Sequence, residues 1–161
     1  MQILIYGYGN PGRQDDGLGV ALVQRAEAWA AEQGLDCLRF ENNYQLNIED
    51  AEAISHQDLV IFADASEEDI DDFCLTEVDG QGKLSFTTHA ASPGYVVKLC
   101  RDLFDKHPRV FLLHIKGYAW DFREGLSDRA QKNLEKAFAY LKNMLKDPTK
   151  ALESKEELKL C

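Results

Sequence analysis

Several features that point to common classes of protein are missing from the 161-residue sequence. Basic residues are outnumbered, with 18 Lys and Arg against 28 Asp and Glu, so the formal net charge is -10. This balance argues against general binding to nucleic acid or to anionic membranes, which depends on a basic face. No apolar run approaches the length of a membrane span, and the N-terminus lacks the regions of a signal peptide. We therefore expect a soluble cytoplasmic protein whose partner is neutral, basic or a cation.

Closely spaced cysteines are also missing. The four cysteines (Cys37, Cys74, Cys100 and Cys161) form no C-x-x-C pair, so neither a zinc ribbon nor a thioredoxin-type motif is indicated. Their scatter predicts reduced, mostly buried thiols, as is usual in the cytoplasm. The hydrophobic fraction of 45% suffices for a core without a disulfide or a structural metal.

Strand-like and helix-like segments alternate along the chain. Apolar, β-rich runs predict strands over residues 2–7, 37–41, 59–65, 73–78 and 109–117. Helical patterns cover about 15–33, 47–55, 92–106 and 127–147. This alternation predicts an α/β three-layer sandwich, in which a mainly parallel twisted sheet is flanked by helices. We expect one domain over residues 1–147, and then a charged tail (148–161) that is at most frayed helix and adds little to the core.

The run from Gly7 to Gly12 after the first strand matches the pattern G-x-G-x-x-G. A dinucleotide-binding turn would begin its helix at this motif and bind pyrophosphate at the helix N-terminus. Here Arg13 and Gln14 delay the helix, and Asp15 and Asp16 at its mouth would repel a phosphate and attract a cation. The glycines are therefore expected to serve a tight turn with close backbone approach.

The acidic pair has both a structural and a functional interpretation. One aspartate is expected to cap the following helix, and the other, Asp16, to point towards the strand ends. Gly17 and Gly19 weaken the first helical turn, which suggests that something approaches closely there. Asp64 ends the most apolar strand, where an isolated carboxylate must cap a helix, pair with a cation or bind a metal. Carboxyl ends of parallel strands are where ligands bind in such sheets.

His89 lies in a loop that leads into a helix. A single histidine is usually a surface residue, and His114, inside an apolar strand, is expected to be a satisfied core histidine. Two aspartates and one histidine on neighbouring loops, however, form a set of two oxygen ligands and one nitrogen ligand with open positions. Such a set suits a first-row divalent ion, and the imidazole shifts the preference from magnesium towards nickel or zinc.

Three signatures together resemble a known family. The runs Gly7-Tyr8-Gly9-Asn10 and Asp15-Asp16-Gly17-Leu18-Gly19, then Phe62-Ala63-Asp64-Ala65, then Thr87-Thr88-His89 are similar to those of the hydrogenase maturation endopeptidases. They occur in the family's order and span roughly residues 2–145.

The resemblance implies a fold, a reaction and a site. The family has a phosphorylase/hydrolase-like α/β sandwich and acts in the cytoplasm on the precursor of a [NiFe] hydrogenase large subunit. It removes a C-terminal extension after nickel insertion, and the substrate's nickel is the recognition element. Carried over by position, Asp16, Asp64 and His89 become the catalytic and metal-binding residues. We expect no tightly bound cofactor and a monomer.

One segment departs from the family pattern. Many members carry an Asp-Gly-Gly-type turn after the second strand, whereas this chain runs from Glu41 to Asp50 without one. The segment resembles a subgroup that acts on soluble, pyridine-nucleotide-linked bidirectional hydrogenases.

Parts of the sequence also match two other functions. A signalling receiver domain also has an acidic pair, a strand-end aspartate and a lysine, which Asp15, Asp16, Asp64 and Lys116 imitate. In a receiver, however, the acidic pair follows the first strand at once, and neither the glycine turn nor His89 has a role. The second rival is a nickel-binding maturation chaperone without catalysis, which would leave the mass of the precursor unchanged.

Overall fold

The computed structural model describes residues 1–80, 91–154 and 158–161. Within these ranges, one sheet of five strands has the order β2-β1-β3-β5-β4. The first four in that order pair in parallel, and β4 pairs antiparallel with β5 at the edge. The mainly parallel sheet is therefore confirmed. The strands are β1 (Ile3–Tyr8), β2 (Leu38–Asn43), β3 (Leu59–Ser66), β4 (Phe73–Glu77) and β5 (Arg109–Lys116).

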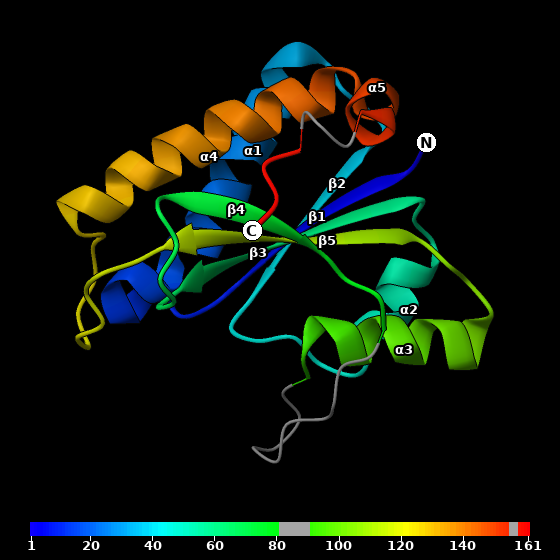
Figure 1. Cartoon of the computed structure of the whole chain (residues 1–161), viewed down its shortest axis with the longest axis horizontal. Coiled ribbons are helices and arrows are strands. Elements are labelled where there is room, and N and C mark those ends of the chain that lie inside the picture. Colours follow the sequence, from blue (N-terminus) through cyan, green and yellow to red (C-terminus); the bar gives the residue numbers. More distant parts are fainter. Residues whose placement is uncertain (81–90, 155–157) are drawn as a thin grey trace.

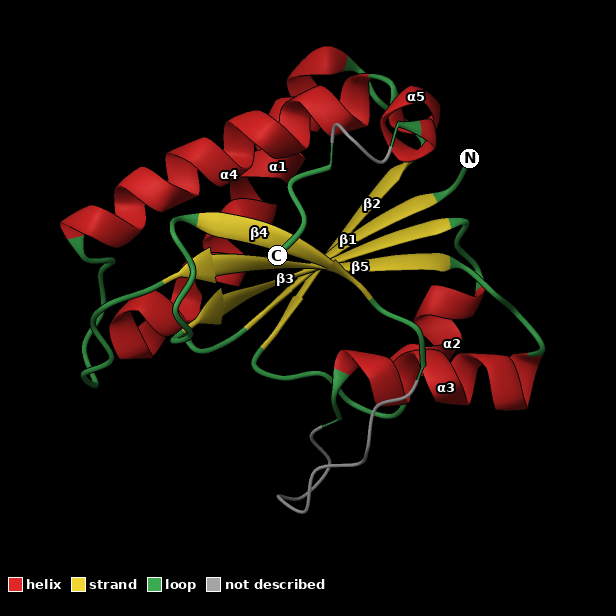
Figure 2. Cartoon of the chain, in the orientation of Figure 1, coloured by secondary structure: helices red, strands yellow, loops and turns green. Residues whose placement is uncertain are grey.

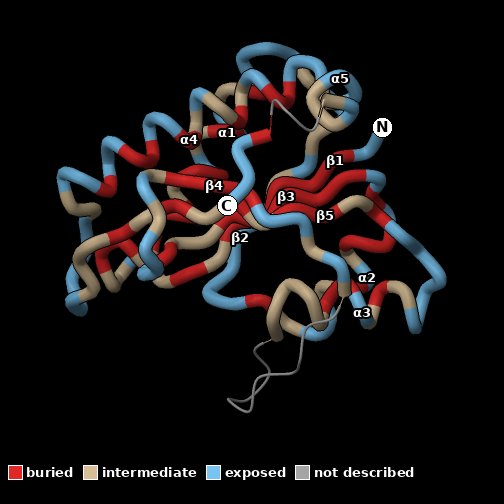
Figure 3. Tube along the Cα trace, in the orientation of Figure 1, coloured by how far each residue is buried: buried red, intermediate tan, exposed pale blue. Residues whose placement is uncertain are grey.

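Helices cover both faces of the sheet (Figures 1 and 2). The helices α1 (Leu18–Gln33), α4 (Asp128–Lys146) and α5 (Pro148–Glu153) lie on one side, and α2 (Asp50–Ser55) and α3 (Pro93–Phe104) lie on the other. Each side has its own buried apolar cluster, because alternate residues of a strand point to opposite faces. In β3, Ile61 and Ala63 join the α1–α4 cluster, whereas Val60 and Phe62 join the α2–α3 cluster. The three-layer sandwich is confirmed, and Figure 3 shows the buried sheet between its helices.

Local signals set most helix ends. Ser92 and Ser127 cap α3 and α4 by accepting hydrogen bonds from the backbone N–H groups of Tyr95 and Ala130. Gly34 ends α1 in the left-handed conformation that glycine adopts without a steric penalty. These ends agree with the sequence patterns.

The start of α1 differs from the prediction. A 3-10 segment, η1 (Pro11–Gly17), precedes the helix, and the capping position is Gly17, which makes no side-chain cap. The expectation that Asp15 or Asp16 caps this helix is therefore wrong, because both carboxylates bind other groups. Gly19 allows α1 to approach the sheet, since a Cβ atom there would lie 2.2 Å from the carbonyl oxygen of Ala63. The chain's own backbone thus accounts for this glycine.

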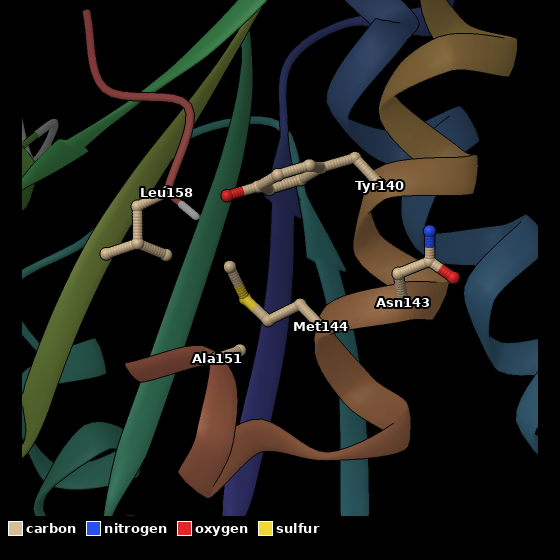
Figure 4. Close-up of a pocket in the computed structure, with 5 residues that line it drawn as sticks. All are labelled: Tyr140, Asn143, Met144, Ala151 and Leu158. Atoms are coloured by element: carbon tan, nitrogen blue, oxygen red, sulfur yellow. The ribbon is translucent and has the colours of Figure 1, made fainter. Parts of the chain in front are cut away.

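The C-terminal segment is not a frayed tail. Pro148 begins α5 instead of ending the helical region, and the Asp147 side chain caps that short helix. Further on, Leu158 is buried in the α1–α4 cluster. Figure 4 shows Leu158 together with Tyr140 and Met144 of α4 around a small pocket. The expectation that residues 148–161 add little to the core is corrected, because an apolar side chain among the charged residues finds a place against α4.

Two of the cysteines are joined. Cys74 of β4 and Cys161 form a disulfide with a Cα–Cα distance of 5.0 Å, while Cys37 and Cys100 are free. The predicted set of four reduced thiols is therefore wrong, and Cys37 is exposed instead of buried. The backbone of residues 159–161 also pairs with Leu75 on the outer edge of β4. None of the described helices combines the length and apolar character needed to cross a membrane.

Candidate active site

Two of the predicted site residues meet at the carboxyl ends of the parallel strands. Asp64 lies near the end of β3, and Asp16 lies in η1, which follows the end of the neighbouring strand β1. Asp64 follows Val60 and Phe62 at every second position, so it lies on the same face of the sheet as the α2–α3 cluster. The structure thus brings together two carboxylates that are 48 positions apart in the sequence.

The environment of Asp64 favours its neutral form. Burial, and after it the nearby charge of Asp16, raise the pKa of this carboxyl to about 7, although hydrogen bonds from the Ala65 backbone and the Tyr8 hydroxyl oppose the shift. An acid with a pKa close to neutrality exchanges its proton readily near pH 7. A cation placed between the two carboxylates would relieve both their repulsion and the penalty of burial.

Asp16 is held in place by the glycine turn. Its Oδ2 atom accepts a hydrogen bond of 2.8 Å from the backbone N–H of Asn10. Gly9 makes this closure possible: its φ is 136°, and a Cβ atom there would lie 2.0 Å from the Asp16 carbonyl oxygen. The glycine-rich run therefore closes a tight turn that orients a carboxylate, in agreement with the role expected for its glycines.

Asp15 points away from Asp16 and serves the fold. Its carboxylate is completely buried and accepts hydrogen bonds from the backbone N–H groups of Tyr118, Ala119 and Ser127 and from the Ser127 hydroxyl. Burial raises the pKa of Asp15, but these hydrogen bonds outweigh that effect and hold it below its usual value. The backbone N–H of Asp15 also donates to the Ala119 carbonyl. One residue thus fastens η1 to the loop between β5 and α4.

The third predicted ligand, His89, lies outside the described residues. In the part of the chain that the structure describes, no group of three or more His, Cys, Asp or Glu side chains could hold a metal ion. His114 is the Cα partner of Asp64 on β5, but its Nε2 atom lies 2.9 Å from the Thr76 hydroxyl. Burial lowers the pKa of His114, and Glu68 opposes that shift. His114 thus has a hydrogen-bond partner, as predicted, but it is half-buried and not a core residue.

Tyr8 is a site residue that sequence reasoning missed. Its hydroxyl donates a hydrogen bond to the Asp64 carboxylate, and its ring lies against Phe62 with centroids 6.4 Å apart. Burial and the charge of Asp64 hold the pKa of Tyr8 well above its usual value, so the phenol keeps its proton and remains a donor. The alternation of side chains along a strand was a usable signal. Tyr8 and Asp64 occupy equivalent positions at the ends of two paired strands, and their side chains lie on the same face of the sheet.

The aromatic residues after β5 contact η1. Arg13 donates from Nε to the Trp120 carbonyl oxygen, and its guanidinium lies 5.8 Å from the ring centre of Phe122. Phe122 is 86% exposed. The loop is therefore held firmly to η1 while presenting an aromatic side chain to solvent.

Comparison with sequences gives no match, either to a family model or to a curated protein. Comparison with solved structures, by contrast, gives several matches. The hydrogenase maturating endopeptidase HybD from E. coli is 18% identical with a TM-score of 0.74, and the match covers 92% of this chain and 94% of that one. The [NiFe] hydrogenase maturation protease HycI from Thermococcus kodakarensis is 20% identical with a TM-score of 0.70, over 91% and 93% of the two chains.

A third structure extends the same pattern. The hydrogenase 2 maturation peptidase from a Thaumarchaeota archaeon is 17% identical with a TM-score of 0.65, over 90% of this chain and 98% of that one. At these identities the likeness shows the fold alone. The fold expected from the sequence motifs is confirmed over nearly the whole chain.

Proposed function

We propose that this protein is an endopeptidase that removes the C-terminal extension of a [NiFe] hydrogenase large-subunit precursor after nickel insertion. The observation that carries the proposal is the juxtaposition of Asp16 and Asp64, with a pKa of about 7 at Asp64. It is supported by the fold, since solved structures with this fold are named as hydrogenase maturation endopeptidases.

The carboxylate pair suits a metal ion that arrives with the substrate. In this proposal, Asp16 and Asp64 bind the nickel of the precursor, and His89 adds an imidazole nitrogen. Tyr8 and Asn10 hold the two carboxylates by hydrogen bonds, so their orientation is set before the substrate binds. The bound nickel then fixes the scissile segment near these side chains, and positioning contributes much of the catalysis.

The receiver-domain alternative fits the side chains poorly. A receiver needs its lysine beside the phosphorylated aspartate, but the ammonium group of Lys116 donates to the backbone carbonyls of Glu67 and Glu68. It also needs both residues of its acidic pair for a metal ion, whereas the Asp15 carboxylate is fully used by backbone and hydroxyl donors. The non-catalytic chaperone remains the alternative that an experiment must separate.

Mass spectrometry of the nickel-loaded precursor tests the proposal. Wild-type protein should shorten the precursor, and Asp16→Ala, Asp64→Ala and His89→Ala should each abolish trimming while remaining folded, because a three-ligand site loses its geometry with one ligand. Asp36→Ala is a matched control, since Asp36 is exposed and precedes β2 at the opposite end of the sheet. A precursor bound by the wild type but unchanged in mass would identify a chaperone instead.

Three finer features belong to the same proposal. The segment from Glu41 to Asp50 in place of an Asp-Gly-Gly turn favours a soluble, pyridine-nucleotide-linked bidirectional hydrogenase as the substrate's source. We also propose that the protein acts as a monomer, because a net charge of -10 disfavours self-association. Its proposed site of action is the cytoplasm.

A further inference from the structure

A groove between α2 and α3 is open to solvent and lined mainly by apolar side chains. It has a volume of about 390 Å³, and its apolar walls include Ile48, Leu99, Leu103 and Phe104. Three of these are well exposed: Ile48 at 39%, Leu103 at 67% and Phe104 at 40%. Among the described residues, seven large hydrophobic side chains are exposed, so nearly half of them gather at this groove. A gathering of this kind marks an interaction surface.

The core accounts for only some of these side chains. The inner side of α3 already packs against the sheet through Val96, Val97 and Cys100, all of which are fully buried. Leu99 and Leu103 lie three and seven positions after Val96, on the flank of the helix that turns towards α2. Leu99 is partly buried against the same cluster, whereas Leu103 and Phe104 at the end of α3 stay exposed and are not covered by any described residue.

The charges around the groove indicate what covers it. Glu49 and Glu52 line it, no basic side chain among the described residues does, and neither glutamate forms an ion pair within that part of the chain. A second copy would bring two pairs of carboxylates together between molecules that each carry a charge of -10. Charge complementarity therefore favours a partner with apolar side chains flanked by Lys or Arg.

We propose that the α2–α3 groove docks an amphipathic, basic segment of the hydrogenase large-subunit precursor. This inference rests on the proposed function for the identity of the partner. Leucine-like side chains of the segment occupy the groove against Leu103, and a lysine or arginine at its edge pairs with Glu49 or Glu52. The groove and Asp64 belong to the same face of the sheet, so a precursor docked in the groove lies on the face that carries the Asp64 side chain.

Two synthetic peptides test the groove directly. Each has about 15 residues, long enough to form a helix on binding, with leucines along one side and either Lys or Glu beside them. The Lys peptide should bind the wild-type protein in a fluorescence titration. Leu103→Asp, and Glu49→Lys combined with Glu52→Lys, should each weaken that binding about tenfold or more. The glutamate pair variant should in turn prefer the Glu peptide.

The matched control is Glu27→Lys combined with Glu32→Lys. Both glutamates are exposed on α1, on the other side of the sheet, and the change in net charge is identical. This variant should bind the Lys peptide nearly as the wild type does. Equal loss in the control and in the groove variant, or equal binding of both peptides by the wild type, would overturn the proposal.

The precursor then separates this inference from the proposed function. If the wild type trims the nickel-loaded precursor, the groove variants should raise KM about tenfold and leave kcat nearly unchanged. Trimming by the groove variants with an unaltered KM contradicts the proposed role of the groove but leaves the endopeptidase function intact. If the wild type does not trim the precursor, the proposed endopeptidase function is wrong. The peptide titrations then still show whether the groove binds a basic segment. A dimer in sedimentation that Leu103→Asp dissociates would show that a second copy occupies the groove, against the proposal.

Discussion

The carboxylate of Asp15 is completely buried and accepts four hydrogen bonds from the loop between β5 and α4. Asp15→Asn replaces one acceptor oxygen by an N–H₂ group that would face the same donors. Asparagine would be tolerated if Asp15 capped α1, but the capping position is Gly17. We predict that Asp15→Asn lowers the free energy of unfolding by about 2–4 kcal/mol, measured by urea denaturation. Asp36→Asn, at an exposed position, should change it little.

The raised pKa of Asp64 predicts that stability depends on pH. Because its pKa is raised from 3.8 to about 7 in the folded protein, the folded state holds a proton that the unfolded chain releases above about pH 4. The contribution of Asp64 to stability therefore falls as pH rises from about 4 to 7 and is level above that range. In the metal-free protein, Asp64→Asn should remove this slope, which urea titrations across the pH range measure. An unchanged slope would show that Asp64 has a normal pKa.

At the scale of residues, the strand-end rule located two carboxylates but could not assign the acidic pair. Asp15 and Asp16 are chemically identical and adjacent, and only the course of η1 sends one inwards and the other towards Asp64. Non-helical backbone angles at Arg13 and Gln14 cause this divergence, with φ of 46° at Gln14. A periodic pattern contains no information on such a kink. His89 as a ligand stays a prediction.

Elements with local signals were predictable, whereas those that depend on distant contacts were not. Serine caps, Gly34 and apolar runs marked the strands and most helix ends in the sequence. The pairing of residues 159–161 with β4, by contrast, involves partners more than eighty positions away, and the disulfide spans 87 positions. No local pattern reports such a contact, so the charged composition alone predicts an unattached tail.

The docked C-terminal segment predicts a loss of stability on truncation. Ending the chain after Thr149 removes Leu158 from the core and the bond between Cys74 and Cys161. We expect the free energy of unfolding to fall by about 3 kcal/mol or more, in a urea titration without reductant. An unchanged midpoint would show that residues 150–161 are dispensable after all.

Cys161→Ser separates the two contributions to this docking. It removes the disulfide but leaves Leu158, the backbone bonds to Leu75 and the interaction of Lys159 with Asp72. Its stability should lie between those of the wild type and the truncated chain. Wild-type protein treated with a dithiol reductant should match it.

At the scale of the whole molecule, the alternation of elements was enough to predict the layers but not the strand order. A strand pattern has no direction of its own, so the antiparallel placement of β4 outside β5 follows only from packing. The carboxyl ends of β1 and β3 could nevertheless be selected beforehand, because parallel neighbours end at one edge. Of the ligand set proposed for that edge, the described residues supply Asp16 and Asp64.

This composition of the site leads to a prediction about the complete reaction. Two carboxylates and one imidazole can bind a cation, but they leave coordination positions open. Such an incomplete set suits an ion presented by another protein better than a permanent site. We therefore predict that trimming requires nickel already in the precursor and that prior treatment of the enzyme with a chelator, followed by its removal, leaves the rate unchanged. Mass spectrometry of nickel-free and nickel-loaded precursor, each mixed with chelator-treated and untreated enzyme, provides all four comparisons.

Trimming of the nickel-free precursor at a comparable rate would contradict the prediction that trimming requires nickel in the precursor. A rate lost with chelator and restored by adding the metal to the enzyme would indicate a metallopeptidase with a metal ion of its own.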